Sequence, residues 1–164
     1  MKKSLFYYVL AMLCMVSLFT SCSKDDDAPV STANEVVGEY SGKLNVVISM
    51  GGMDIPAGTI DPQAITVTKA GDNAINLSIT NFTFNEIPVG NIELKNCTLT
   101  ANGDKYDFTG TTDIDKAPML TADVAATGSF SNGTLTLDLD IDAVLGSTNQ
   151  TVKVTYSGTK QEQK

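Results

Sequence analysis

From residue 36 onward the sequence alternates apolar and polar residues, with short clusters of turn-forming residues between the alternating segments. The segment 134–142 shows this pattern most clearly, because Leu135, Leu137, Leu139 and Ile141 are separated by threonine and aspartate residues. Successive side chains of a β-strand point to opposite faces, so the pattern predicts strands with one buried face. No sustained period of 3.6 residues accompanies it. The sequence therefore predicts an all-β fold.

Eight strands are expected, the first over Val36–Met50 and the second after Pro62. Asn102-Gly103 and Asn132-Gly133 are dipeptides typical of tight hairpin turns. The connections are short, which favours an antiparallel meander. Closing a meander into a barrel removes its exposed edges. We therefore predict an eight-stranded antiparallel up-and-down barrel, with a β-sandwich as the alternative.

Two predicted strands change the parity of their apolar positions partway along. The first change falls near Thr80-Asn81 and the second near Lys95-Asn96. A β-bulge inserts one extra residue and produces such a change, so we expect a bulge at each place. The longest predicted connection runs from Gly51 to Pro62 and is unusually apolar for a loop. Long connections often form lids or binding loops, and an extra hairpin arm packed on the barrel is the alternative.

Composition excludes several classes of chemistry. The chain has no histidine, arginine or tryptophan, so neither a histidine-based catalytic triad nor a histidine-ligated zinc is possible. It has 11 lysines and 19 acidic residues, and the resulting net charge of −8 argues against binding to nucleic acid. A carboxylate-based hydrolase would need two acids in one cleft, and no such pair stands out. We therefore expect a non-enzymatic protein without a cofactor.

The N-terminal segment reads as an export signal. Two lysines precede an apolar run that ends at Cys22, so residues 1–21 predict a cleaved signal peptide rather than a retained transmembrane helix. The string Leu18-Phe19-Thr20-Ser21-Cys22 resembles a bacterial lipobox, which implies that Cys22 is lipidated and anchors the chain to a membrane. Residues 22–35 are expected to form an acidic tether and linker. Lys24 and the aspartates after it resemble the export tag of Bacteroidetes lipoproteins. This implies an outer-membrane protein that faces the cell surface, with the periplasmic face as the alternative.

Loss of the signal peptide leaves nine lysines against 19 acids, a net charge of −10. Cys14 leaves with the signal and Cys22 is expected to carry lipid, so Cys97 is the one remaining thiol. No intramolecular disulfide can then form, and the fold must be stabilised by its core. Cys97 lies in period with Leu99 and is expected to be a small buried hydrophobe.

Three short motifs resemble a known family. Val37–Leu44 is similar to the opening of the calycin-like β-barrel domain of Bacteroides lipoproteins, and Asn81–Phe84 followed by Ile87–Ile92 is similar to its middle motif. The resemblance covers residues 36–159, within a predicted barrel domain of residues 36–160 and before a polar tail of residues 161–164. It implies a calycin-like or lipocalin-like barrel and leaves the ligand unassigned.

A barrel of this size can hold one small ligand or be filled by its own side chains. The first hypothesis is a binding module for a small apolar or glycan ligand held at the mouth of the barrel. Its candidate ligand-binding residues are Tyr40, Met53, Ile55, Phe82, Phe84, Tyr106 and Tyr156. The alternative is a packed, ligand-free barrel that acts as a structural or interaction subunit of an outer-membrane complex. That alternative predicts an exposed apolar patch within residues 51–62.

The acidic residues are expected on the surface. Asp138, Asp140 and Asp142 alternate with the apolar residues of one strand, so they belong to its solvated face. Asp113 and Asp115 are placed in the loop before Pro118, where a calcium site is the weaker alternative to plain surface residues. No metal site is predicted.

Overall fold

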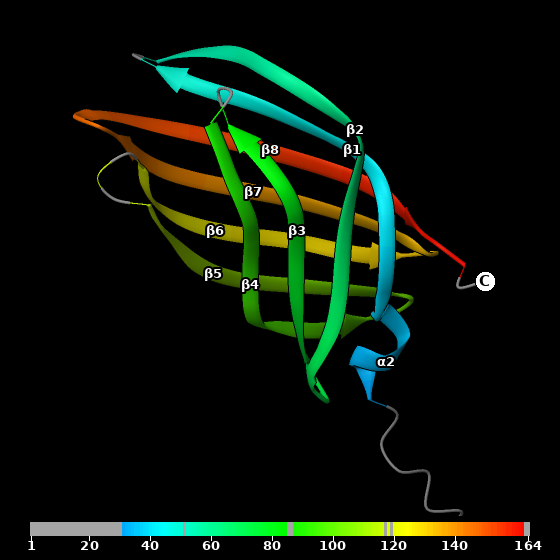
Figure 1. The fold of residues 1–164 in the computed structure, drawn as a ribbon. Coiled ribbons are helices and arrows are strands. Elements are labelled where there is room, and N and C mark those ends of the chain that lie inside the picture. The colour runs from blue at the N-terminus through cyan, green and yellow to red at the C-terminus, as the bar shows by residue number, and fades with distance from the viewer. Residues whose placement is uncertain (1–30, 51, 85–86, 117, 119, 163–164) are drawn as a thin grey trace, which may run out of the picture. The chain divides into compact units, whose positions relative to one another are not determined.

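The computed structural model describes residues 31–50, 52–84, 87–116, 118 and 120–162, with the backbone alone described at residues 50, 84 and 87–89. In these residues one short helix precedes eight strands (Figure 1). In chain order the elements are α2 (Thr32–Val36), β1 (Gly38–Met50), β2 (Met53–Gly71), β3 (Ala74–Phe84), β4 (Ile87–Asn102), β5 (Lys105–Lys116), β6 (Leu120–Ser131), β7 (Thr134–Leu145) and β8 (Thr148–Lys160).

The strands form a closed barrel in sequence order, and every neighbouring pair is antiparallel. The closure is made by β1, which pairs with β8 from Tyr40–Lys160 to Ser49–Thr151. The prediction of an eight-stranded up-and-down barrel is confirmed. A sandwich would leave β1 and β8 without this pairing, so the alternative fold does not apply.

The predicted turns and bulges have the expected backbone geometry. Asn132 and Gly133 join β6 to β7 with φ values of 49° and 72°, as a type I′ hairpin turn requires. The pairing of β3 with β4 shifts register at Asn81 and again at Asn96, and φ is positive at both residues. Both bulges predicted from the changes of parity are therefore confirmed.

Of the two interpretations of the stretch from Gly51 to Pro62, the hairpin arm is confirmed and the long loop is wrong. β2 begins at Met53 and pairs with β1 from the Met50–Met53 pair onward. Its prolines and glycines suggested a loop. However, β2 pairs with β3 only from Ile65 onward, and before that point it is an edge strand, where proline is tolerated.

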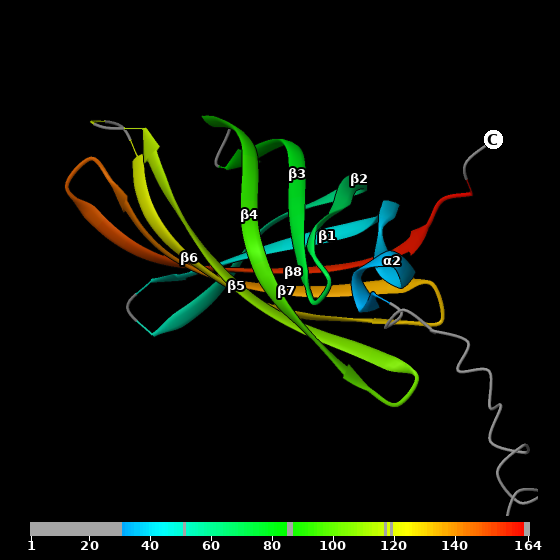
Figure 2. The same cartoon turned by 90° about the horizontal axis from the view of Figure 1, so that it is seen from below.

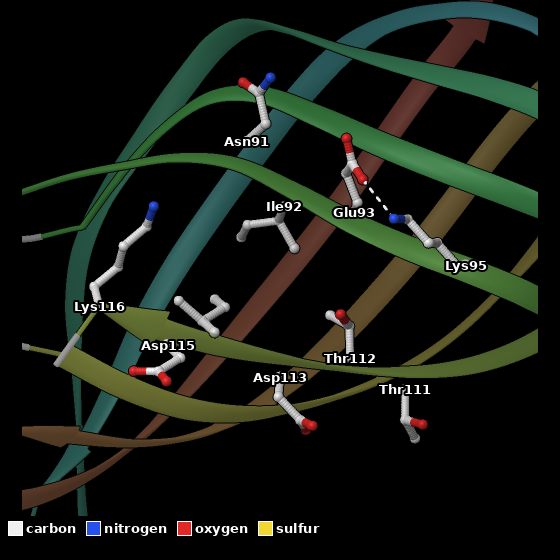
Figure 3. Close-up of a pocket in the computed structure, with 10 residues that line it drawn as sticks. Asn91, Ile92, Glu93, Lys95, Thr111, Thr112, Asp113, Asp115 and Lys116 are labelled. Carbon is white, nitrogen blue, oxygen red and sulfur yellow. Dashed lines mark ion pairs between the residues drawn. The ribbon is translucent and has the colours of Figure 1, made fainter.

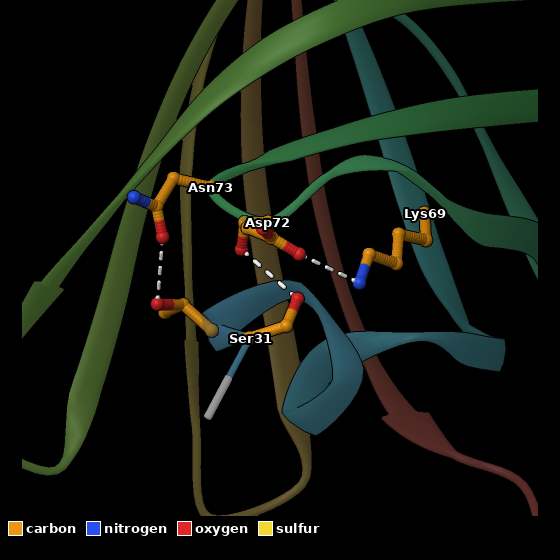
Figure 4. Close-up of polar contacts among 5 residues, drawn as sticks. Ser31, Lys69, Asp72 and Asn73 are labelled. Atoms are coloured by element: carbon orange, nitrogen blue, oxygen red, sulfur yellow. Dashed lines mark hydrogen bonds and ion pairs between the residues drawn. The ribbon is translucent and has the colours of Figure 1, made fainter. Parts of the chain in front are cut away.

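The end of the predicted linker is also corrected. Residues 32–36 form α2, in which Ala33 and Val36 are buried. The helix lies beside the turn between β2 and β3 (Figures 1 and 2). Ser31 Oγ donates to the carbonyl of Asp72 at 3.1 Å, and Thr32 Oγ1 donates to Asn73 Oδ1 at 2.9 Å (Figure 4). These contacts, and burial of the two apolar side chains, make α2 part of the folded body.

The core fills the inside of the barrel with alternating residues of every strand. On β7, Leu135, Leu137, Leu139 and Ile141 are buried while the residues between them are exposed, as predicted. Cys97 is also completely buried, in agreement with the sequence. Within the described part of the chain, no helix has the length and apolarity needed to cross a membrane.

Candidate functional site

Aromatic side chains pack against one another inside the barrel. The ring centroids of Tyr40 and Phe130 are 5.5 Å apart, and those of Phe108 and Phe130 are 5.2 Å apart. All three side chains are at most 3% exposed. These distances fit tilted aromatic pairs in a packed core. The three rings therefore occupy the space that a ligand in this part of the barrel would need.

The two buried tyrosines direct their hydroxyl groups to backbone carbonyls. Tyr40 Oη donates to the carbonyl of Val36 at 2.8 Å, and Tyr156 Oη donates to that of Gln63 at 3.3 Å. Burial raises the pKa of Tyr40 to about 12. Burial, and to a lesser degree the neighbouring Tyr40, raises the pKa of Tyr156 to about 12. Both hydroxyls thus donate to carbonyls of the protein's own backbone, and both are neutral at physiological pH.

The predicted ligand-binding residues do not converge on one site. Tyr40, Phe82 and Tyr156 are buried and Tyr106 is half-buried, whereas Met53 and Ile55 are 68% and 48% exposed at the tip of the β1–β2 hairpin. Tyr40 pairs with the end of β8, while Phe82 lies near its beginning, so they occupy opposite ends of the barrel. The side chain of Phe84 and all of Cys22 lie outside the described residues.

The apolar end of the barrel beside Phe82 is nearly closed. The cavity there has a volume of about 20 Å³. Its lining is apolar throughout and consists of Phe82, Ile114, Leu120, Ala122, Ile141, Ala143 and Val152. A single water molecule already needs roughly 10–15 Å³ of such space. This cavity therefore has no room for a ligand of several heavy atoms.

A larger opening lies in the wall of the barrel, between β4 and β5. These strands form five pairs, from Thr98–Thr109 to Asn102–Lys105, and diverge beyond them (Figures 1 and 2). The divergence leaves a groove of about 390 Å³, which we call the β4–β5 groove. Figure 3 shows Asn91, Glu93 and Lys95 on one bank and Thr111–Lys116 on the other.

Two local features explain where the groove begins. The bulge at Asn96 bends β4 just before Cys97, close to the last residue that pairs with β5. At the same level, Cys97 Sγ occupies the place that a Cβ atom would take at Gly110. The cysteine thus packs at the point where the two strands part, and the glycine provides the space for it.

The barrel wall also divides between β2 and β3, but a side chain fills that division. Pairing of β2 with β3 begins at Ile65–Ile79, and the buried Gln63 lies just outside it. Gln63 Nε2 donates to the carbonyl of Thr80 at 3.0 Å and to that of Ala64 at 2.9 Å. The amide of Gln63 therefore donates hydrogen bonds to backbone carbonyls at the place where the pairing of β2 with β3 ends.

The acidic residues lie on the outer surface. Asp138, Asp140 and Asp142 face solvent on β7, as predicted. Asp113 and Asp115 lie within strand β5, so their predicted position in a loop is wrong. No group of three or more acidic or cysteine side chains in the described residues is arranged to hold a metal ion.

The register joins three carboxylates across neighbouring strands. Asp113 of β5 lies opposite Asp123 of β6, which lies opposite Asp142 of β7. Like charges directly opposite each other on a sheet are destabilising. Sequence patterning placed Asp142 on an outward face but did not predict this row, because the row depends on pairing between strands.

A closed antiparallel barrel of eight strands in sequence order defines the class of small up-and-down β-barrel domains. This chain belongs to the family of the calycin-like beta-barrel domain, whose model matches residues 36–159. The resemblance of the sequence motifs is thereby confirmed.

A structure from Bacteroides fragilis NCTC 9343, of a protein provisionally named an outer membrane protein, is similar in fold. The two align with a TM-score of 0.63 and 14% sequence identity, over 80% of this chain and 53% of that chain. This chain thus spans about half of its structural neighbour, and the likeness concerns the fold alone. Comparison with curated proteins gives no match.

Proposed function

We propose that the protein is a non-enzymatic interaction module of the bacterial cell envelope, which binds a macromolecular partner through the outer wall of its barrel. The observation that carries this proposal is the filled interior. Tyr40, Phe108 and Phe130 occupy one part of it, and the cavity at the apolar end measures about 20 Å³. Binding then has to use the outside of the barrel.

Two outer features support a macromolecular partner. Met53 and Ile55 expose apolar side chains at the tip of the β1–β2 hairpin, within the segment where the interaction hypothesis expects an apolar patch. The β4–β5 groove exposes polar and backbone groups along two strands. Binding of a small apolar or glycan ligand inside the barrel stays a prediction, and the small interior volume weighs against it.

The proposed anchor is a lipid on Cys22, attached to the outer membrane with the barrel facing the cell surface. The lipobox-like string before Cys22 and the acidic residues after Lys24 support this placement. A structural neighbour that is provisionally named an outer membrane protein supports an envelope location. Two or more acyl chains give stable anchoring, so no membrane-spanning segment is needed.

The anchor is tested by expressing the full chain in a Bacteroidetes host fed an alkyne-labelled fatty acid. We expect the wild-type protein to carry the label and to be degraded when protease is added to intact cells. The Cys22→Ser variant should carry no label and leave the membrane fraction. A wild-type protein that takes up no label, or that resists protease until the cells are broken, contradicts the proposed location.

The mode of binding is tested by native mass spectrometry of the full lipidated chain released from membranes with detergent. We expect the native mass to equal the denatured mass, apart from any bound protein, because aromatic side chains fill one part of the interior and the cavity beside Phe82 is too small for a ligand. A discrete additional small mass that is lost on denaturation contradicts the proposal and favours a small-ligand carrier.

A further inference from the structure

The bank of the groove formed by β5 is a regular strand edge. All twelve residues of β5 pair with β6 without a shift in register. The two-residue turn between Asn102 and Lys105 makes these residues a hydrogen-bonded pair, so alternate residues of β5 from Lys105 onward direct their backbone groups toward β4. By this alternation Thr111 and Asp113 direct their N–H and C=O groups into the β4–β5 groove. We call Gly110–Ile114 the open edge.

We propose that the β4–β5 groove accepts an extended, cationic polypeptide segment, which pairs as an added strand with the open edge of β5. This proposal rests on the proposed function and specifies the partner's chemistry and the place where it binds. Strand addition obtains its affinity from main-chain hydrogen bonds and its specificity from alternate side chains.

The open edge lacks two of the devices by which proteins protect exposed strands. Proline and bulges are common devices against unwanted pairing. The bulge at Asn96 and the positive φ of Gly90 are both on β4, and Gly110–Ile114 contains neither a proline nor a shift in register. Of the two banks, β5 is therefore the one suited to receive a strand.

Charge determines which strand fits. Asp113 points outward beside the open edge, and Asp123 and Asp142 continue the acidic surface across β6 and β7. On the β4 bank, Lys95 is paired with Glu93 at 3.2 Å, so these two charges offset each other. Lys116 also lines the groove, at the end of β5. Outward side chains of an added strand would lie directly beside Asp113, where lysine or arginine is favourable.

The same charges disfavour a second copy of this chain. Antiparallel pairing of two open edges about Asp113 would place the two Asp113 carboxylates opposite each other. The inner side of the groove is apolar, because Ile92 is buried and Ile114 is half-buried against the core. The best-fitting segment therefore alternates basic residues facing out with apolar residues facing in.

The test measures binding of fluorescein-labelled peptides to the full chain in detergent by fluorescence anisotropy. The probe is an eight-residue peptide of alternating lysine and valine. Its controls are a glutamate–valine peptide and a lysine–valine peptide N-methylated at alternate residues on the edge that faces β5. We expect the lysine–valine peptide to bind, N-methylation to weaken binding at least about tenfold, and the acidic peptide to bind more weakly than either.

Two variants test the same contacts from the side of the protein. Thr111→Pro removes one N–H of the open edge and should weaken binding about three- to tenfold, as expected for one hydrogen bond. Asp113→Lys should weaken binding of the lysine–valine peptide and strengthen binding of the glutamate–valine peptide. Asp138→Lys places the same charge on β7, away from the groove, and should change the dissociation constant less than about twofold.

Several results would overturn the inference. Equal binding of the methylated and unmethylated peptides, or equal effects of Asp113→Lys and Asp138→Lys, would mean that the attraction is only diffuse electrostatics. A dimer of the full chain that Thr111→Pro dissociates would assign the groove to a second copy. Should Thr111→Pro fail to fold, the methylated peptide tests the same hydrogen bonds with wild-type protein.

The proposed function can survive failure of this inference. Photo-crosslinking in intact cells from a reactive residue at Met53, far along the chain from β5, tests for a partner on another part of the wall. A specific partner captured there, together with absence of peptide binding, would retain the interaction module and reject the strand-binding groove.

Discussion

The backbone N–H of Asn96 on β4 donates a 2.9 Å hydrogen bond to Oδ1 of Asn76 on β3. The second bulge repeats the arrangement with the strands exchanged, because the N–H of Asn81 on β3 donates to Asn91 Oδ1 on β4 at 3.2 Å. In both places an asparagine with positive φ interrupts the ladder and an asparagine of the facing strand accepts its N–H. The β3–β4 hairpin therefore contains two bulges with the same pattern of asparagine hydrogen bonds.

The left-handed backbone at Asn96 predicts a specific order of stabilities. Asn96 has a φ of 54°, which asparagine and glycine tolerate and a β-branched residue does not. We expect Asn96→Val to lower the free energy of unfolding by about 1–2 kcal/mol, and Asn96→Gly to change it by less than about half of that. Urea denaturation followed by circular dichroism measures both. Equal losses for the two variants would show that the side chain, rather than the backbone conformation, matters.

A pair of glycine substitutions tests how closely the barrel is packed. A Cβ atom at Gly158 would collide with the ring of Tyr156 and approach the carbonyl of Ser41, whereas one at Gly71 would meet only Ala74 at an ordinary 3.6 Å. We expect Gly158→Ala to destabilise the protein by about 1–3 kcal/mol. Gly71→Ala should be neutral or slightly stabilising, because it restricts the unfolded chain. Thermal unfolding compares the two, and a Gly158→Ala variant as stable as Gly71→Ala would contradict the close approach.

The aromatic core predicts a large effect at its centre. Phe130 contacts both Tyr40 and Phe108, so truncation of its ring removes two aromatic contacts and leaves a cavity. We expect Phe130→Ala to lower the free energy of unfolding by about 3–5 kcal/mol. Val144→Ala removes a side chain that is 39% exposed and is the control, with an expected change below about 1 kcal/mol. A small effect of Phe130→Ala would mean that the interior is not closely packed.

Local patterns in the sequence were enough to predict the strands and their inward faces. The strict alternation on β7 and the changes of parity at Asn81 and Asn96 depend only on neighbouring residues, and both were interpreted correctly. The segment 51–62 was left open between a loop and a hairpin arm, because glycine and proline usually interrupt strands. They are tolerated at this edge of β2, and whether a strand is an edge depends on its partners rather than on its own residues.

The candidate site could not be predicted from the sequence, for a related reason. Parity indicates that Tyr40 and Phe82 point inward, but it does not tell whether the interior is full or at which end each residue lies. The groove arises because β4 and β5 stop pairing after Thr98–Thr109. The groove begins at the bulge at Asn96, beside Cys97 and Gly110, and the sequence shows this bulge only as a change of parity. That the bulge separates β4 from β5 can be seen only from the packing of the two strands.

Stability should fall in alkaline solution because of the two buried tyrosines. The pKa of Tyr40 and of Tyr156 is about 12 in the folded protein and 10.0 for a solvated tyrosine. Between these values the unfolded chain releases protons that the folded chain keeps, so the free energy of unfolding decreases as pH rises from about 10 to about 12. Below pH 10 both states are protonated at these groups and the effect is absent.

The alkaline decrease is measured from urea midpoints between pH 9 and pH 12. Tyr156→Phe removes one of the two ionisable hydroxyls and keeps the ring, so we expect its stability to fall less steeply with pH than that of the wild type. The same variant should be somewhat less stable near pH 8, because the hydrogen bond to Gln63 is lost. An unchanged slope in the variant would show that other groups cause the alkaline decrease.

The last prediction concerns the thiol at the head of the groove. Cys97 is completely buried, and burial raises the pKa of its thiol, so the reactive thiolate is disfavoured in the folded protein. In a chain that begins at Ser31, Cys97 is the only cysteine. We expect this chain to react slowly with Ellman's reagent at pH 8 and rapidly after addition of urea. Cys97 lies where β4 and β5 part, so its reaction rate also reports whether the strands separate further.

If the native thiol reacts at the rate of the unfolded one, the groove opens as far as Cys97 and the strands are not held together at Thr98–Thr109. If the reaction is slow in wild type and fast in Gly110→Ala, the contact between Cys97 Sγ and Gly110 is what seals this end of the groove.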